Sequence, residues 1–139
     1  MVEKANKTLL VGWATRNITP DKSVLLRGQL YERISKYVRD PLTTTALALE
    51  TVDENGQASD YAVMVSCDLA SITKSLLQDV RDRLESKIQN FDVKKVFIFA
   101  THTHTGPVYE KDDGKKYKDI KRYDDSNKEV MSPVECQNF

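Results

Sequence analysis

Two apolar runs with an amphipathic stretch between them constrain the fold of this chain more than any other feature. The runs are residues 61–67 (YAVMVSC) and 96–100 (VFIFA), and both have the nearly continuous apolar pattern of strands buried on both faces. Between them, aliphatic residues recur at helical spacing among charged residues, which predicts a helix that Ser71 or Thr73 can cap. The apolar stripe of this helix consists of Leu76, Leu77, Val80, Leu84 and Ile88. This order predicts a βαβ unit, with parallel strands and a right-handed crossover.

The residues before this unit predict further strands. Residues 42–52 (LTTTALALETV) alternate with a period of two, and the turn sequence DENG at 53–56 joins them to the run at 61–67, which predicts an antiparallel hairpin. Residues 8–15 (TLLVGWAT) predict a first strand, and residues 23–30 a weaker and shorter one. The fold class is therefore α/β, with a mixed β-sheet that contains a βαβ unit and an antiparallel hairpin. We expect this sheet to be part of a larger layered α/β domain.

The chain length allows two kinds of domain organisation. Residues 1–139 are enough for a single domain, or for the N-terminal fragment of a larger one. Residues 109–129 are dense in Lys, Asp and Glu, which predicts a charged, mobile loop within the domain. Ser132, Pro133 and Glu135 form the start signature of a helix, yet only about one turn of sequence follows them. We therefore expect the helix to continue in a longer protein.

Composition argues against several functional classes. Lys plus Arg and Asp plus Glu are each 21, so the net charge is zero, unlike that of proteins that bind nucleic acid through bulk charge. No apolar run approaches the roughly 20 residues of a transmembrane helix. The first ten residues lack the apolar stretch of a secretory signal, and the compartment stays open. Cys67 and Cys136 form neither a disulfide framework nor a Cys-based zinc site, and Cys67 is expected to be a buried small side chain.

Both histidines of the chain lie in one short motif that directly follows the second apolar run. The motif is THTHTGP at residues 101–107, with His102 and His104 two residues apart. In an extended chain, residues two apart point to the same side, so the two imidazoles would face one side together. Such a pair suits Zn²⁺ or a similar ion. The alternative is a pair of polar side chains that are hydrogen-bonded in a turn, and spacing alone does not decide between the two.

Carboxylates are expected near the same edge of the sheet. Asp68 directly follows the first apolar run, and the carboxyl ends of parallel strands meet at one edge, where sites in open α/β sheets lie. Asp40 precedes the antiparallel partner of that strand, which places it at the same edge. Asp68 could ligate a metal or orient an imidazole, or it could serve as a cap or turn residue. For Asp40, a turn before Pro41 is the alternative, and Arg39 could bind an anionic group or form a surface ion pair.

Four segments of the chain resemble the N-terminal part of the neutral/alkaline, non-lysosomal ceramidase family. The resemblance extends from about Leu10 to Pro107, and the motif at 101–107 is its most specific part. The segments are Val11-Gly12, Asn17-Ile18-Thr19-Pro20, Val65-Ser66-Cys67-Asp68-Leu69 and Ala100-Thr101-His102-Thr103-His104-Thr105-Gly106-Pro107. The chain departs from the family at Thr105, where Ser is usual, and at 108–110, where the family is rich in glycine. The charged residues 111–128 are also unlike a lipid-binding channel.

The resemblance implies a zinc-dependent amidase that hydrolyses an N-acylsphingosine to a fatty acid and a sphingoid base. It implies that His102 is a zinc ligand and that His104 lies beside the metal, where it positions or polarises the substrate. Asp68 matches the acid of the family's Asp-Leu step and is taken as a supporting catalytic residue, with Arg39 and Asp40 as substrate-binding candidates. The family's other zinc ligands (a His, a Glu and a Tyr) come from regions beyond this chain. The isolated chain is therefore expected to be inactive and its zinc site incomplete.

Two alternatives to this function remain open. One is another metal-dependent hydrolase with a His-x-His pair, of the amidohydrolase or metallo-β-lactamase type, although Gly106-Pro107 stands where the lactamase type has Asp-His. The other is a binding module that keeps the fold without the chemistry. The expected partner is a small-molecule or lipid amide, with no nucleic acid and no transmembrane segment, and the oligomeric state is open.

Overall fold

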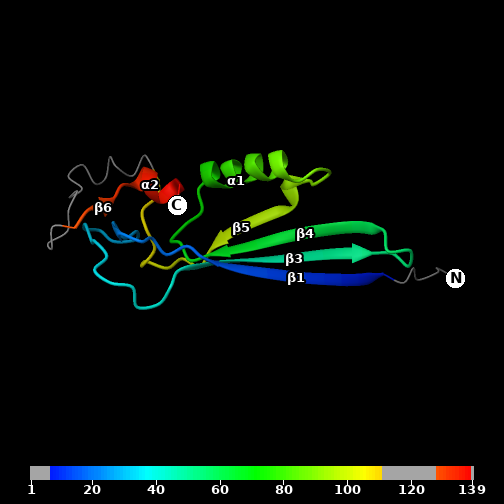
Figure 1. Ribbon diagram of the computed structural model, residues 1–139, viewed down its shortest axis with the longest axis horizontal. Coiled ribbons are helices and arrows are strands. Elements are labelled where there is room, and N and C mark those ends of the chain that lie inside the picture. The colour runs from blue at the N-terminus through cyan, green and yellow to red at the C-terminus, as the bar shows by residue number, and fades with distance from the viewer. Residues whose placement is uncertain (1–6, 111–127, 139) are drawn as a thin grey trace.

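The main β-sheet has four strands in the order β1-β3-β4-β5. The computed structural model describes residues 7–110 and 128–138 (Figure 1). The strands are β1 (Thr8–Asn17), β3 (Thr43–Val52), β4 (Ala58–Cys67) and β5 (Val96–Ala100). β3 is antiparallel to both β1 and β4, whereas β4 and β5 are parallel. The predicted α/β class and mixed sheet are therefore confirmed, and the strand from 96 to 100 has the predicted bounds.

A helix and a short 3-10 helix connect the parallel strands, as expected for a βαβ unit. They are α1 (Lys74–Lys87) and η1 (Val93–Lys95). Of the two candidate caps, Thr73 is the one observed, and its hydroxyl accepts a hydrogen bond of 3.1 Å from the N–H of Leu76. Leu76 packs beside a buried cluster that contains Cys67, Leu69 and Tyr109, so α1 is anchored to β4.

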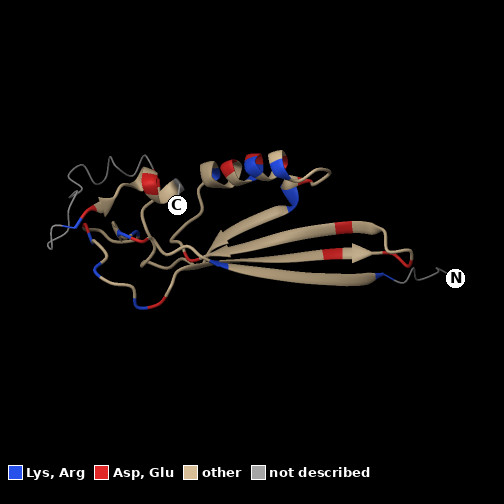
Figure 2. Cartoon of the chain, in the orientation of Figure 1, with Lys and Arg blue, Asp and Glu red and all other residues tan. Residues whose placement is uncertain are grey.

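Among the described residues, β4 and β5 are covered on one face only, which differs from the sequence-based expectation, and β1 is exposed along its whole length. Met64 on β4 is 40% exposed, and Phe97 and Phe99 on β5 are 55% and 45% exposed. On β1, Trp13 is 76% exposed. Because side chains alternate between the faces of a strand, α1 covers Val65 and Ile98 and leaves these larger residues open. Charged side chains are concentrated on α1 and in loops, and the strands are largely free of them (Figure 2).

A second, two-stranded sheet lies at the end of the main sheet where β5 terminates. It pairs β2 (Ser23–Val24) with β6 (Val130–Met131) in parallel. The predicted strand over 23–30 is thus much shorter, because Leu25 and Leu26 form only isolated bridges and the chain then turns at Gly28. Leu26 pairs with Pro107, which brings this region against the histidine motif.

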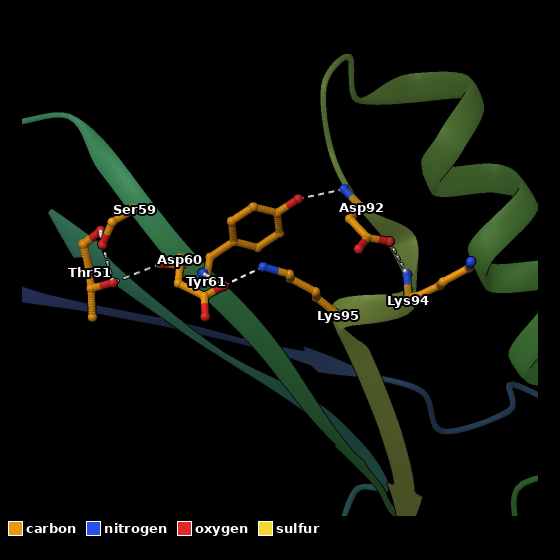
Figure 3. A network of polar contacts seen from close by, with 7 residues as sticks. All are labelled: Thr51, Ser59, Asp60, Tyr61, Asp92, Lys94 and Lys95. Atoms are coloured by element: carbon orange, nitrogen blue, oxygen red, sulfur yellow. Dashed lines mark hydrogen bonds and ion pairs between the residues drawn. The ribbon is translucent and has the colours of Figure 1, made fainter.

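Polar contacts fasten the opposite end of the sheet, where β4 begins and β5 follows η1 (Figure 3). Lys95 forms an ion pair with Asp60 and lies over the ring of Tyr61, 4.7 Å from its centroid. The hydroxyl of Tyr61 accepts a hydrogen bond from the N–H of Asp92, and the Asp92 carboxylate caps η1 through the N–H of Lys94. These contacts set the start of β5, and hence the place where its carboxyl end meets that of β4.

The last described element begins with the predicted capping box. α2 (Pro133–Asn138) follows Ser132, whose N–H donates to the Glu135 carboxylate at 2.7 Å, while the N–H of Glu135 donates back to the Ser132 hydroxyl at 3.3 Å. Among the described residues, no helix has the length and apolar character needed to cross a membrane. Most of the predicted charged loop, residues 111–127, lies outside the described residues.

Candidate functional site

The carboxyl ends of β4 and β5 meet at one edge of the sheet. Cys67 and Ala100, the last residues of the two strands, are partners in the parallel ladder. Asp68 and Thr101 therefore begin their loops side by side. Thr43, the first residue of β3, lies at the same edge because β3 is antiparallel to β4. The sequence predicted this convergence, and the structure confirms the placement of Asp68 and the histidine motif at a common edge.

Asp68 accepts hydrogen bonds at this edge through both of its carboxylate oxygens. The N–H and the hydroxyl of Thr43 donate to Oδ2 at 2.8 and 2.9 Å, and the hydroxyl of Thr101 donates to Oδ1 at 3.1 Å. Burial tends to raise the pKa of Asp68, but the hydrogen bonds from Thr43 and Thr101 outweigh it and leave the pKa below its usual value. Asp68 is therefore an ionised group that ties the starts of two loops and a strand together.

The two histidine rings converge at the same edge, although not through an extended chain. His102 has a φ of 63°, in the left-handed region, so the backbone turns sharply within the motif. The Nε2 atoms of His102 and His104 are nevertheless 3.4 Å apart, with ring centroids separated by 5.0 Å and planes at 75°. Both residues are exposed. The turn, and not the two-residue alternation of a strand, thus brings the imidazoles together.

A backbone carbonyl fixes the orientation of the His102 ring. Nδ1 lies 2.6 Å from the carbonyl oxygen of Ala70, which can only accept a hydrogen bond, so Nδ1 carries the hydrogen. In the neutral ring this leaves the Nε2 lone pair directed toward His104. The sequence allowed Asp68 to orient an imidazole, but the structure gives that position to Ala70.

The separation of the two Nε2 atoms fits a zinc ion. Two nitrogen ligands at Zn–N distances of about 2.0–2.1 Å and a tetrahedral angle lie about 3.3–3.4 Å apart. The observed distance of 3.4 Å matches this value. Within the described part of the chain, no third His, Cys, Asp or Glu joins the pair to complete a metal site.

Two residues that support His104 were not identified from the sequence. Arg33 donates from Nη2 to the His104 carbonyl oxygen at 2.9 Å. Gly28, with a φ of +90°, lies so close that a Cβ there would clash with the His104 ring. A glycine within LLRGQL is a weak sequence signal of such a close approach, whereas nothing in the sequence marks Arg33.

Arg39 and Asp40 are not in contact with the histidine pair. Their side chains are 87% and 85% exposed and form an ion pair of 3.6 Å with each other. Both residues line a groove of about 570 Å³ that extends to Thr105, next to His104. They therefore lie on the approach to the candidate site and not within it.

The cysteines and Tyr109 belong to the packing beneath the site. Cys67 is buried as expected, and burial raises the pKa of its thiol. Burial raises the pKa of Cys136 to about 11, so this thiol stays protonated. Tyr109 is 6% exposed, and its hydroxyl donates to the Ser71 carbonyl at 2.9 Å. The first residue of the predicted charged loop is thus part of the core.

Structural comparison finds solved ceramidase structures that share the fold of most of this chain. No family model matches the sequence, and no curated protein matches it. The structure is similar to neutral ceramidase from Pseudomonas aeruginosa, with a TM-score of 0.62 and 22% identity over 76% of this chain and 16% of that chain. It is also similar to a ceramidase complexed with C2, with a TM-score of 0.62 and 24% identity over 73% of this chain and 16% of the other. Over about three quarters of its length, the chain therefore has the fold of a small part of the ceramidase structures.

Proposed function

We propose that this chain is the N-terminal piece of a zinc-dependent amide hydrolase that resembles neutral ceramidase. The observation that carries this proposal is the pair of Nε2 atoms, 3.4 Å apart, at the carboxyl edge of a sheet with the ceramidase fold. The proposed reaction is hydrolysis of an N-acylsphingosine to a fatty acid and a sphingoid base, since the matched structures are ceramidases.

Each residue of the edge has a proposed role that follows from its contacts. His102 would hold the zinc through Nε2, because Ala70 keeps its Nδ1 protonated. Zinc, when bound, would act as a Lewis acid toward a carbonyl and lower the pKa of a water molecule. His104 is exposed and adjacent, so it can contact both the metal and the substrate amide. Asp68 would maintain the loop geometry, and Arg39 and Asp40 would contact substrate in the groove.

We further propose that the isolated chain is catalytically silent. The sequence has two histidines, and catalytic zinc usually has three protein ligands in addition to water. A further ligand would have to come from outside the described residues. The matched region makes up 16% of each ceramidase chain, which leaves ample sequence in such a protein to supply it.

Metal binding by the chain tests the role of the histidine pair. We expect the chain to bind Zn²⁺ weakly, and His102→Ala and His104→Ala to reduce the affinity at least tenfold each, as measured by competition with a chromogenic chelator. Glu85→Gln is the matched control, because it removes a carboxylate, a common metal-binding group, from α1 and not from the edge that carries the histidines. Equal zinc binding by all four proteins would contradict the proposal.

Hydrolysis separates the catalytic claim from metal binding. In the full-length protein, His102→Ala should abolish hydrolysis of N-acylsphingosines and lower the zinc content. His104→Ala should reduce turnover more than zinc content there, because the further ligands that the isolated chain lacks would still hold the metal. Simpler amides serve as alternative substrates in the same assay. Hydrolysis by the 139-residue chain alone would contradict the proposal that this chain is inactive. Full activity of a His102→Ala protein would refute the role of His102.

A further inference from the structure

The groove beside the histidine motif has the size of a small-molecule site. It encloses about 570 Å³, within the range of roughly 300–1,000 Å³ that is typical of ligand pockets. The loop between β2 and β3 forms most of its wall, and Thr105 of the histidine motif also lines it. Arg33 links the wall to the motif, because it lines the groove and donates to the carbonyl oxygen of His104.

The charged side chains of the groove are predominantly positive. Its lining contains four cations and one carboxylate: Lys22, Arg33, Lys36, Arg39 and Asp40. Two of the cations have carboxylate partners, since Lys22 pairs with Glu129 at 2.9 Å and Arg39 pairs with Asp40. Among the residues that the structure describes, Arg33 and Lys36 have no carboxylate partner. The groove therefore favours a ligand with a negative charge.

Apolar side chains form much of the remaining wall. Leu26, Ile34, Val38 and Leu42 line the groove together with Tyr37. Val38 is 59% exposed and Tyr37 is 81% exposed, so apolar surface is open to a ligand there. Burying such surface is favourable at roughly 25 cal/mol per Å². A ligand that matches both kinds of wall has an apolar chain and a single anionic group.

We propose that this groove binds a long-chain carboxylate, with its head group at Arg33 and Lys36 and its chain along Val38 and Leu42. The planar guanidinium of Arg33 can donate to a carboxylate, and only one of its nitrogens is used by His104. The charge and shape of the groove carry the choice of an anionic amphiphile. The choice of a carboxylate rests on the proposed function, because amide hydrolysis at the adjacent histidine pair would release one.

Binding of dodecanoate to the 139-residue chain tests the proposal without any need for turnover. Isothermal titration is run with EDTA present, so that zinc contributes nothing, and dodecanol and dodecylamine serve as neutral and cationic ligands of equal chain length. We expect dodecanoate to bind at least tenfold more tightly than either. Comparable affinity for all three ligands, or absence of dodecanoate binding, would overturn the proposal whether or not the protein is a zinc hydrolase.

Two pairs of variants locate the binding site. Lys36→Gln should weaken dodecanoate binding by about threefold to fivefold, as expected for a partly exposed charge pair, while Lys87→Gln on α1 should leave it unchanged. Val38→Asp places a carboxylate in the groove and should abolish binding, whereas Val134→Asp, at an exposed residue that does not line the groove, should not. Equal effects within either pair would place the ligand elsewhere and refute the site.

A final comparison tests the head group. Dodecyl phosphate has the same chain length with a phosphate in place of the carboxylate. We expect dodecanoate to bind at least as tightly, with the same dependence on Lys36. Tighter binding of dodecyl phosphate would overturn the assignment of the head group as a carboxylate, and this result would not depend on whether the histidine pair catalyses amide hydrolysis.

Discussion

At the residue scale, Gly28 sets the position of His104. It combines a φ of +90° with a close approach to the imidazole ring, so a side chain there is excluded twice, by backbone strain and by lack of space. Gly28→Ala should lower the zinc affinity of the histidine pair by about tenfold or more, because the His104 ring has to move.

Gly56→Ala provides a matched control for Gly28→Ala. Gly56 also has a positive φ, of +76°, but nothing lies within 4 Å of the Cβ that a substitution would add. We expect this variant to show the strain cost of about 1–2 kcal/mol in urea denaturation and unchanged zinc affinity. Equal zinc affinity of the two variants would show that Gly28 has no effect on the site beyond backbone strain.

Asp68 is expected to make the edge of the sheet sensitive to acid. Its pKa is lower in the folded protein than in the unfolded chain, where it lies near 3.8, so its contribution to stability is fully present above about pH 5. This contribution is lost as the pH falls below 3.8 and through the folded-state pKa. Asp68→Asn should reduce the free energy of unfolding by about 1–3 kcal/mol at pH 7, because Thr43 and Thr101 lose an ionised acceptor.

Urea denaturation at pH 7 and at pH 3 measures this effect. The difference between wild type and Asp68→Asn should shrink at pH 3, because below 3.8 the unfolded chain gains a proton at this carboxylate more readily than the folded protein does. Asp60→Asn, which removes an exposed ion pair at the far end of the sheet, should change the stability at pH 7 much less than Asp68→Asn does. If the loss of stability caused by Asp68→Asn does not change with pH, the ionised form of Asp68 is not what stabilises this edge.

At the element scale, Thr73 makes contacts both with the start of α1 and with Tyr109. The hydroxyl of Thr73 caps the helix, and the backbone N–H of Thr73 donates to the Tyr109 hydroxyl at 3.1 Å. Thr73→Ala should reduce the free energy of unfolding by about 1 kcal/mol in thermal or urea denaturation, since it removes the cap. Thr73→Ser keeps a hydroxyl and should restore most of this loss. Equal losses for both variants would contradict a capping role.

At the scale of the whole molecule, one face of the sheet is left open by the residues that the structure describes. It presents Trp13, Met64, Phe97 and Phe99, each at least 40% exposed, on three strands. Apolar surface of this extent is typical of interfaces and of proteins that self-associate. We expect the chain to associate as its concentration rises, with a blue shift in the emission of Trp13, its single tryptophan.

Sedimentation velocity and Trp emission over a range of concentrations test this expectation. Phe97→Lys should suppress the association because it places a charge on the open face. Leu30→Lys should have no effect, since Leu30 is a fully exposed apolar residue in a loop away from the sheet. Concentration-independent sedimentation of the wild-type chain would show that the open face does not drive association.

The sequence by itself determined the elements that depend on local pattern. Apolar periodicity predicted β5 and the βαβ unit, and the capping box of Ser132 and Glu135 predicted the start of α2, because strands, helices and caps involve residues that are near in sequence. The parallel arrangement of β4 and β5 then placed Asp68 and the histidine motif at a common edge.

Only the tertiary structure decided how the residues at that edge meet. Gly28 and Arg33 support His104 from a loop that is distant in sequence, and Asp68 bonds to Thr43 and Thr101, while Ala70 holds the ring of His102. Periodicity also predicted strands buried on both faces, whereas the described residues cover only one, because an apolar pattern does not specify which element packs against it. These contacts arise from long-range packing, to which local sequence patterns are insensitive.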